Sequence, residues 1–242
     1  MIRLYGICPV SGLPDVSTFV IKVDCYLRMV EMPYTLVSLL GDNSTKSSAR
    51  ASSGEPPSPP KGKFPYIDDG GRVIADSSFI IDYLKATYGD KLGENKLNSE
   101  ERAIALIVRR MVEEHLYWVI VYAAWMEDAL WERHKRLVFG SLSPTEIEAQ
   151  REGVRQELLG QGMGRHSRSE VYEMGNADLS ALSVYLADKP YALGKQPTAL
   201  DATLYGFLAH ILWSPYEYPL KTHARTLPNF EAYCQRMRKQ YY

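Results

Sequence analysis

The chain has 242 residues, with 28 lysines and arginines against 29 aspartates and glutamates, and a formal net charge of −1. This length suits one large core or two modest ones, while the balanced charge gives no global reason to expect a nucleic acid as partner. No apolar run approaches a membrane span, the N-terminus lacks a signal-peptide pattern, and the three cysteines have neither CxxC nor metal-ligand spacing, so we expect a reducing, cytoplasmic setting and no metal site.

The N-terminal part predicts alternating strands and a helix. We expect a strand over 2–7, a helix that begins near Ser17 and is stopped by Pro33, and a second strand over 34–40. Within the helix, apolar spacing predicts one buried side and leaves Lys22 and Asp24 exposed. The βαβ order implies a right-handed crossover and a parallel pair of strands.

Residues 41–59 interrupt this pattern with many serines and prolines and almost no apolar side chains. Such a composition cannot bury enough surface to offset the entropy cost of ordering. We therefore predict a flexible insertion, and both a lid and an inert linker remain open.

The segment from Pro60 to Leu84 predicts a hairpin followed by a helix. Short strands over 66–68 and 72–74 flank Asp69-Gly70-Gly71, which favours a tight turn because glycine tolerates positive φ. Asp76 or Ser77 is the expected N-cap of the next helix.

Pro65 opens the first of these strands, so a cis Phe64–Pro65 bond would hold the Phe64 backbone at an exposed edge. An unpaired edge can bind a peptide-like ligand, and the helix N-terminus beside it can hold a carboxylate. A surface hairpin that leads into an ordinary helix is the alternative.

The second half of the chain predicts only helices. We expect a long helix over 99–138, in one piece or two, a helix that starts at the Ser143–Glu146 capping box, and helices over 170–187 and 228–239. Another capping box joins Thr198 and Asp201. The predicted domains are therefore an α/β unit over 1–90 and an all-helical unit over 98–242.

These motifs resemble glutathione transferases. Residues 60–84 are similar to the second half of their thioredoxin-like domain, and residues 195–202 are similar to the cap of a buried helix in their C-terminal domain. The resemblance implies an α/β thioredoxin-like domain followed by an all-α helical bundle. Residues 19–29, 59–65, 162–167 and 178–183 further resemble the failed-axon-connections proteins, relatives of metaxins, a branch that contains both glutathione-dependent enzymes and adaptor-like proteins.

The resemblance places glutathione, as cosubstrate, on the N-terminal domain. It implies that Phe64 and Pro65 meet the cysteinyl part through main-chain bonds, and that Asp76 and Ser77 hold the γ-glutamyl end. Lys63, beside this segment, is included in the predicted glutathione site.

A thiol with a pKa near 8.5 is mostly protonated at neutral pH, although the thiolate is the nucleophile. The Ser17–Val23 segment resembles the S-P-F-x-x-K-V helix start of many bacterial transferases, whose Ser or Cys contacts the sulfur. Ser17 is therefore our leading candidate to activate the thiol, with helix capping alone as the alternative. Thr18, Tyr5 and Cys8 are the alternate candidates.

Aromatic and basic residues of the helical half are candidates for the electrophile pocket. Tyr117 and Tyr122 would form an apolar aromatic wall, and Arg165 and His166 would bind an anionic group; packing and helix capping are the alternatives. We expect a transferase that conjugates the glutathione thiolate to a small hydrophobic electrophile and that serves in detoxification. The sequence leaves open whether the protein forms a homodimer. A non-catalytic adaptor or ligand-binding protein of the same fold is the alternative.

Overall fold

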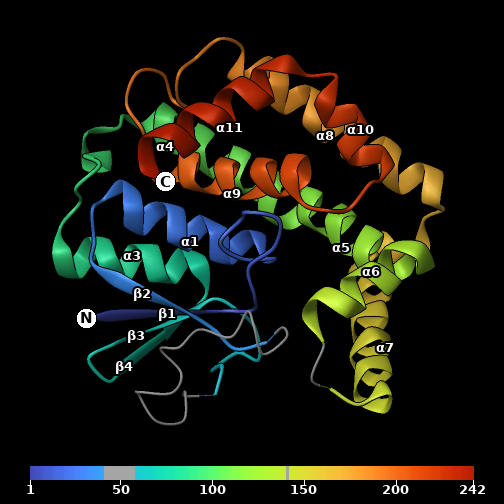
Figure 1. The fold of residues 1–242 in the computed structure, drawn as a ribbon. Helices are drawn as coiled ribbons and strands as arrows, with labels where there is room; N and C mark the ends of the chain where they lie inside the picture. Colours follow the sequence, from blue (N-terminus) through green and yellow to red (C-terminus); the bar gives the residue numbers. More distant parts are fainter. Residues whose placement is uncertain (41–57, 140–141) are drawn as a thin grey trace.

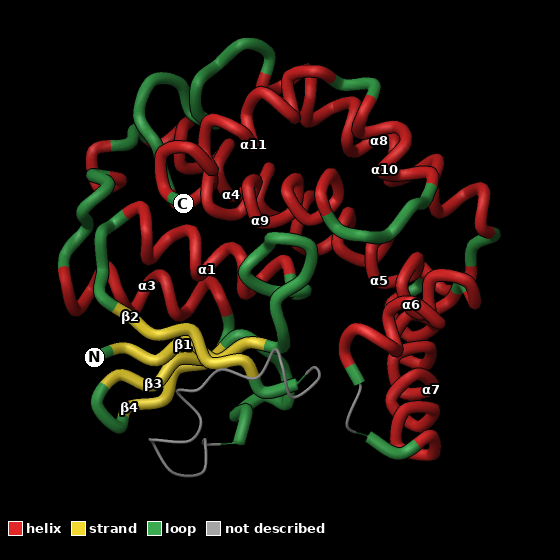
Figure 2. The backbone as a smooth tube through the Cα atoms, in the orientation of Figure 1, coloured by secondary structure: helices red, strands yellow, loops and turns green. Residues whose placement is uncertain are grey.

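The computed structural model describes residues 1–40, 58–139 and 142–242, and it begins with a four-stranded sheet (Figure 2). The strands are β1 (Ile2–Gly6), β2 (Tyr34–Ser38), β3 (Tyr66–Asp69) and β4 (Arg72–Ala75). Their order is β2-β1-β3-β4, with β2 parallel to β1 and β3 antiparallel to both of its neighbours. The predicted parallel pair and hairpin are confirmed. The predicted insertion at 41–59 lies almost wholly outside the described residues.

Helices α1 (Thr18–Met29) and α3 (Ser77–Tyr88) cover the face of the sheet that is turned toward the helical half of the molecule (Figure 1). Ser17 caps α1, and Asp76 caps α3 by accepting from the backbone N–H groups of Ser78 and Phe79 at 2.9 and 3.3 Å. The Phe64–Pro65 bond is cis, and Gly70 and Gly71 in the hairpin turn have positive φ.

The rest of the described chain is helical (Figure 1). Its elements are η1 (Glu94–Lys96), α4 (Ser99–Arg110), the π-helical η2 (Met111–Leu116), α5 (Tyr117–Met126), α6 (Asp128–Val138), α7 (Pro144–Gln161), η3 (Met163–Arg165), α8 (Arg168–Leu186), α9 (Ala199–Trp213), α10 (Pro219–Arg225) and α11 (Pro228–Tyr241). Residues 99–126 form one continuous helical stretch that ends at Glu127, so the predicted long helix is indeed broken in two. The short α10 escaped sequence analysis. Within the described ranges, no helix combines the length and apolar character needed to cross a bilayer.

Helix α9 lies at the centre of the helical half and packs directly against α1. The two backbones come so close at Gly206 that an added Cβ atom would lie 2.7 Å from the Thr18 carbonyl oxygen and 3.0 Å from the Lys22 nitrogen. The predicted capping box at the start of α9 is present, and Asp201 also accepts from Ala192 N at 2.7 Å and from the Tyr233 hydroxyl at 2.8 Å.

Because α1 lies between the sheet and α9, the predicted exposure of Lys22 and Asp24 is wrong. Both residues are buried, at 1% and 0% exposure. Asp24 accepts hydrogen bonds from Arg28 Nε at 3.1 Å and from the Tyr242 hydroxyl at 2.6 Å.

Lys22 and Glu113 together join four elements of the structure. Lys22 Nζ lies 2.6 Å from Glu113 Oε1 in η2 and donates to the hydroxyls of Ser77 and Ser78 in α3, at 2.9 and 3.1 Å. Thr203 of α9 donates to the same Glu113 oxygen at 3.4 Å. Burial lowers the pKa of Lys22, and Glu113 opposes that shift. This buried ion pair therefore ties the sheet domain to the helical half.

We predict that Glu113→Ala lowers the free energy of unfolding by about 3–5 kcal/mol, because it leaves the buried Lys22 ammonium without its counter-charge. Urea denaturation measures this loss. The matched control is Glu114→Ala, since Glu114 pairs with Arg110 on the surface and its loss is expected to cost about 1 kcal/mol or less. Similar losses for the two variants would contradict a buried, coupled pair.

Candidate functional site

Several cavities lie between the α/β domain and the helical half, and Tyr117 lines two of them. The first, which we call the α3 cavity, has a volume of about 340 Å³ and lies between the start of α3 and the helical stretch from α4 to α5. The second, the α1 cavity, has a volume of about 110 Å³ and lies between the start of α1 and helices α5, α6 and α9. These two cavities, which share Tyr117, are the two compartments of the candidate site at the domain interface.

The α3 cavity is rich in charged and hydroxyl groups. Its lining includes Asp76 and Ser77, which sequence analysis assigned to the glutathione site, together with Arg109 and Glu113. Ser77 Oγ accepts a hydrogen bond from the Lys22 ammonium, so its own hydrogen is free for another acceptor. Arg109 donates to Ser78 Oγ at 2.9 Å. The lining carries Arg109 and Arg110 together with four carboxylates, those of Asp76, Asp82, Glu113 and Glu114. With the N-terminus of α3, this mixed set of charges suits a ligand group that carries both signs of charge.

Asp76 is held in an unusual backbone conformation at the edge of the α3 cavity. Its φ is 81°, in the left-handed region that L-residues other than Asn and Asp seldom adopt. Strain of this kind tends to persist at functional sites. The carboxylate is exposed while its Oδ1 caps α3, so it can also meet a cationic group of a ligand.

Phe64, Pro65 and Lys63 lie outside the lining of both cavities. The Phe64 ring is 5.8 Å from that of Tyr66, and Pro65 is buried at the start of β3. Lys63 pairs with Glu157 of α7 at 2.7 Å, with both side chains largely exposed.

Ser17 and Thr18 bring hydroxyl groups to the α1 cavity. Ser17 is half-buried, and its Oγ accepts from Val20 N at 3.4 Å, a long bond. Thr18 is 3% exposed, and its Oγ1 has no hydrogen-bond partner among the described residues. The remaining wall is mostly apolar.

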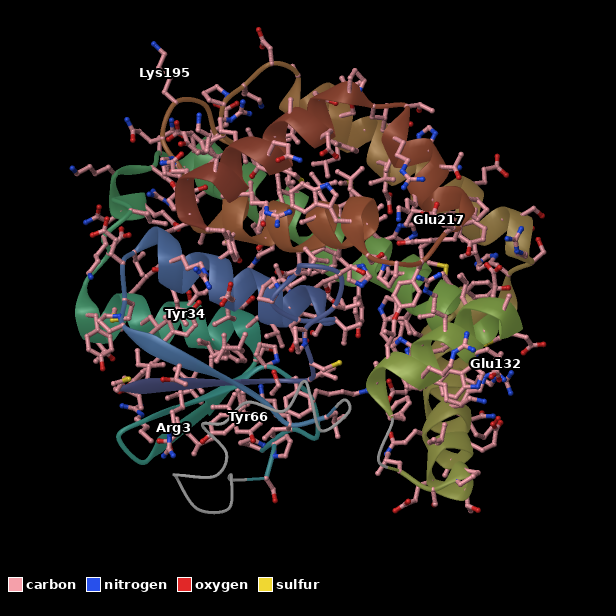
Figure 3. All side chains as sticks on the ribbon, viewed as in Figure 1. Arg3, Tyr34, Tyr66, Glu132, Lys195 and Glu217 are labelled. Carbon is pink, nitrogen blue, oxygen red and sulfur yellow. The ribbon has the colours of Figure 1, made fainter. Side chains whose placement is uncertain are left out.

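The alternates Tyr5 and Cys8 lie elsewhere. Tyr5 stacks on Tyr66 at 4.5 Å between ring centroids, in a separate apolar cluster with Val37. Figure 3 shows Tyr66 on the side of the sheet away from α1 and α3, so Tyr5 is directed away from both cavities. Cys8 is 1% exposed, and its Sγ lies 3.6 Å from the Leu137 carbonyl oxygen.

Sequence analysis missed Asp15, which holds Ser17 in place. The fully buried carboxylate accepts from the backbone nitrogens of Ile7 and Ser17, both at 2.7 Å, and so joins the end of β1 to the start of α1. Burial raises the pKa of Asp15, and these two N–H groups oppose the shift. In the sequence, the only sign of this role was an acidic residue two positions before the predicted helix cap at Ser17.

Of the predicted pocket residues, the structure brings only Tyr117 to the cavities. Burial raises its pKa to about 12, so its hydroxyl is protonated at neutral pH. Tyr122 is buried outside both linings. Arg165 and His166 follow the turn after α7, where Arg165 Nε donates to the Leu159 carbonyl at 2.9 Å, and the exposed His166 faces Glu170 at 4.0 Å.

The α1 cavity also contains a histidine pair that sequence analysis did not find. His134 of α6 and His210 of α9 line it with Tyr216, and His134 Nδ1 lies 2.8 Å from the Tyr216 hydroxyl. Burial lowers the pKa of His134 to about 3 and that of His210 to about 4. Both imidazoles are therefore neutral at pH 7. Among the described residues, no group of three or more His, Cys, Asp or Glu is placed to hold a metal ion.

The burial of His134 predicts a loss of stability in acid. Its folded-state pKa is below the unfolded value, so the unfolded chain takes up a proton first and stability falls as pH drops below about 6.5. We expect His134 to account for about 2 kcal/mol of the stability lost between pH 7 and pH 5. Denaturation across this range should give a shallower pH dependence for His134→Phe than for the control His166→Gln. Parallel curves would contradict a neutral buried imidazole.

Comparison with known proteins agrees with this architecture. Residues 18–130 match the family described as the glutathione S-transferase N-terminal domain, and residues 175–237 match the glutathione S-transferase C-terminal domain. A solved structure of a beta-etherase from Sphingobium sp. strain SYK-6 superimposes with a TM-score of 0.61 at 16% identity, covering 99% of this chain and 98% of that one.

Two curated relatives are similar over nearly the whole chain. Isoprene-epoxide–glutathione S-transferase from Rhodococcus sp. (strain AD45) is 38% identical over 100% of this chain and 99% of its own length. Failed axon connections from Drosophila melanogaster is 29% identical over 98% of this chain and 57% of its own length. The second similarity confirms the branch that the sequence motifs indicated.

Proposed function

Because the chain belongs to the glutathione S-transferase family, we propose that it is an enzyme that joins the thiol of glutathione to a small hydrophobic electrophile. The observation that carries this proposal is the pair of cavities that meet at Tyr117. One is charged and suits a zwitterionic peptide end, and the other is largely apolar and begins at Ser17.

The γ-glutamyl end of glutathione fits the chemistry of the α3 cavity. Its carboxylate would lie at the N-terminus of α3 and accept from the Ser77 hydroxyl, near the charges of Lys22 and Arg109. Its ammonium group would meet the exposed Asp76 carboxylate. The cysteinyl main chain would pair with the backbone at Phe64, ahead of β3, which brings the sulfur toward the α1 cavity.

The chemical step would take place at the start of α1. The thiol proton passes to solvent, and the Ser17 hydroxyl donates a hydrogen bond to the thiolate. Each unit by which this bond lowers the thiol pKa corresponds to about 1.4 kcal/mol of stabilisation of the thiolate. The sulfur then attacks a carbon of the electrophile in the α1 cavity, and the bond to the leaving atom breaks with its electron pair. The name of the 38% identical relative supports an epoxide as this electrophile.

A non-catalytic binding protein is the second candidate. The Ser17 hydroxyl already accepts from Val20 N, as a simple cap would, and the Failed axon connections relative spans nearly the whole chain. This candidate keeps the glutathione or ligand site and omits the activation of sulfur, so binding and turnover have to be measured separately.

We predict that glutathione binds with micromolar-to-millimolar affinity and that Asp76→Asn weakens it about tenfold or more. Asparagine caps a helix and tolerates positive φ about as well as aspartate, so this change removes only the charge that would pair with the γ-glutamyl ammonium. Calorimetry measures both affinities. Arg165→Ala is the control, because Arg165 lies outside both cavities. Equal affinities for the two variants would refute the role of Asp76, and no heat from wild type at millimolar glutathione would refute the site.

We predict that Ser17→Ala raises the pKa of bound glutathione and lowers turnover at neutral pH, with part of the loss recovered at higher pH. Thiolate absorbance during a pH titration measures the change. Ser143→Ala is the matched control, because Ser143 caps the remote helix α7, and its loss should cost about 1 kcal/mol of stability and leave the thiol pKa unchanged. A Ser17 variant that behaves like this control would identify Ser17 as a cap and favour the binding protein.

A further inference from the structure

Two residues that line the α1 cavity each have a buried hydrogen-bonding atom without a partner among the described residues. Thr18 Oγ1 and His210 Nδ1 are fully buried, and neither has a hydrogen-bond partner among the described residues. Both residues line the cavity. They come from the two helices that meet at Gly206, so the fold holds them in fixed positions.

A buried polar atom without a partner costs about 1–3 kcal/mol. Most buried polar groups are therefore paired, and two orphans in one cavity indicate that a bound molecule completes them. His134 and Tyr216, on the same wall, satisfy each other at 2.8 Å. Among these four polar residues of the lining, Thr18 and His210 are therefore the ones with an unpaired atom.

The electrostatic character of the α1 cavity limits which molecules can bind there and pair with Thr18 and His210. The burial of both imidazoles keeps them neutral at pH 7, and the described lining contains no Lys, Arg, Asp or Glu. An anion or cation would enter without a counter-charge, which is unfavourable in a buried site. An uncharged group with an oxygen that accepts hydrogen bonds fits.

The size of the α1 cavity limits the molecule further. A cavity of roughly 150 Å³ accommodates benzene, whereas this one has about 110 Å³. Besides its hydroxyl and imidazole groups, its lining is apolar and includes Ile7, Val16, Ile120 and Val121. A molecule with about as many heavy atoms as benzene or fewer, apolar except for one oxygen, matches this space.

We propose that Thr18 and His210 bind the oxygen of the electrophile, and that the substrate class is a small, uncharged epoxide. This inference rests on the proposed transferase function and adds the residues that select the electrophile. The glutathione sulfur forms a bond to an epoxide carbon, and the carbon–oxygen bond breaks with its electron pair going to oxygen. Thr18 and His210 donate hydrogen bonds to the developing alkoxide, which takes a proton from water to become the hydroxyl of the product. Donors aimed at developing charge stabilise the transition state more than the ground state.

The test compares two electrophiles of equal carbon number, 1,2-epoxybutane and 1-bromobutane, at saturating glutathione. Both react by attack of sulfur on carbon, but only the epoxide builds charge on an oxygen. We expect Thr18→Val, which keeps the shape and removes the hydroxyl, to lower the ratio of kcat/KM for epoxide over bromide about tenfold. His210→Phe should lower the same ratio, and the isosteric Thr18 change decides the matter if the histidine variant does not fold. Thr222→Val, a matched change on the remote helix α10, should leave the ratio unchanged.

Any other outcome contradicts a specific part of the proposal. An unchanged ratio in Thr18→Val refutes the role of the hydroxyl. Equal losses for both electrophiles, with a raised thiol pKa, would show that Thr18 acts on the sulfur and refute its assignment to the oxygen. Wild type that conjugates the bromide and not the epoxide refutes this inference and leaves the transferase proposal intact. Wild type that binds glutathione and conjugates neither refutes the transferase proposal, and this inference falls with it.

Discussion

The contact between α1 and α9 at Gly206 is the constraint on which the site depends. With a Cβ atom excluded by the Thr18 carbonyl and the Lys22 nitrogen, the two helices lie as close as backbones allow. Lys22 and Thr203 then reach Glu113 on one side of the contact, and Thr18 and His210 line the α1 cavity on the other. A side chain at position 206 would push both compartments open together.

The two compartments differ in electrostatic character, and that difference follows from where their charges are neutralised. In the α3 cavity, arginines and carboxylates lie beside hydroxyls and a helix N-terminus, so a charged group bound there would replace water with fixed partners. In the α1 cavity, burial removes charge from the imidazoles themselves. The proposed peptide thiol, with its zwitterionic end, and the proposed neutral electrophile would thereby bind in different places, with Tyr117 at the boundary.

Local sequence patterns predicted the parts of the fold that local physics decides. The Asp69-Gly70-Gly71 turn, the Asp76 cap and the Asp201 capping box each depend on neighbours within a few residues. The assignment of the Asp76–Ser77 pair to a ligand site depended on the family resemblance as well, and the structure places this pair in the lining of the α3 cavity. Helix periodicity failed at Lys22 and Asp24 because it assumes one buried face, whereas α1 is covered on two sides.

Sequence patterns could not predict the hydrogen-bonding groups of the α1 cavity, for a different reason. Thr18, His134 and His210 are far apart in the chain, and only the packing of α1, α6 and α9 brings them together. Asp15 gave no recognisable signal because its partners are backbone N–H groups, which are the same in every residue type. Tyr5 was considered for the thiol because it is near the end of β1, but side-chain alternation along the strand turns it to the other face of the sheet.

The burial of Cys8, Cys25 and Cys234 has a consequence for how the folded chain would withstand reactive electrophiles. All three thiols are 1% exposed or less, and burial raises the pKa values of Cys25 and Cys234 well above the usual range. Alkylating agents react with thiolates that they can reach, so the folded chain offers them almost no target. Under the proposed function, this burial would protect the chain from self-inactivation, and the thiol that reacts with a bound electrophile would be that of glutathione.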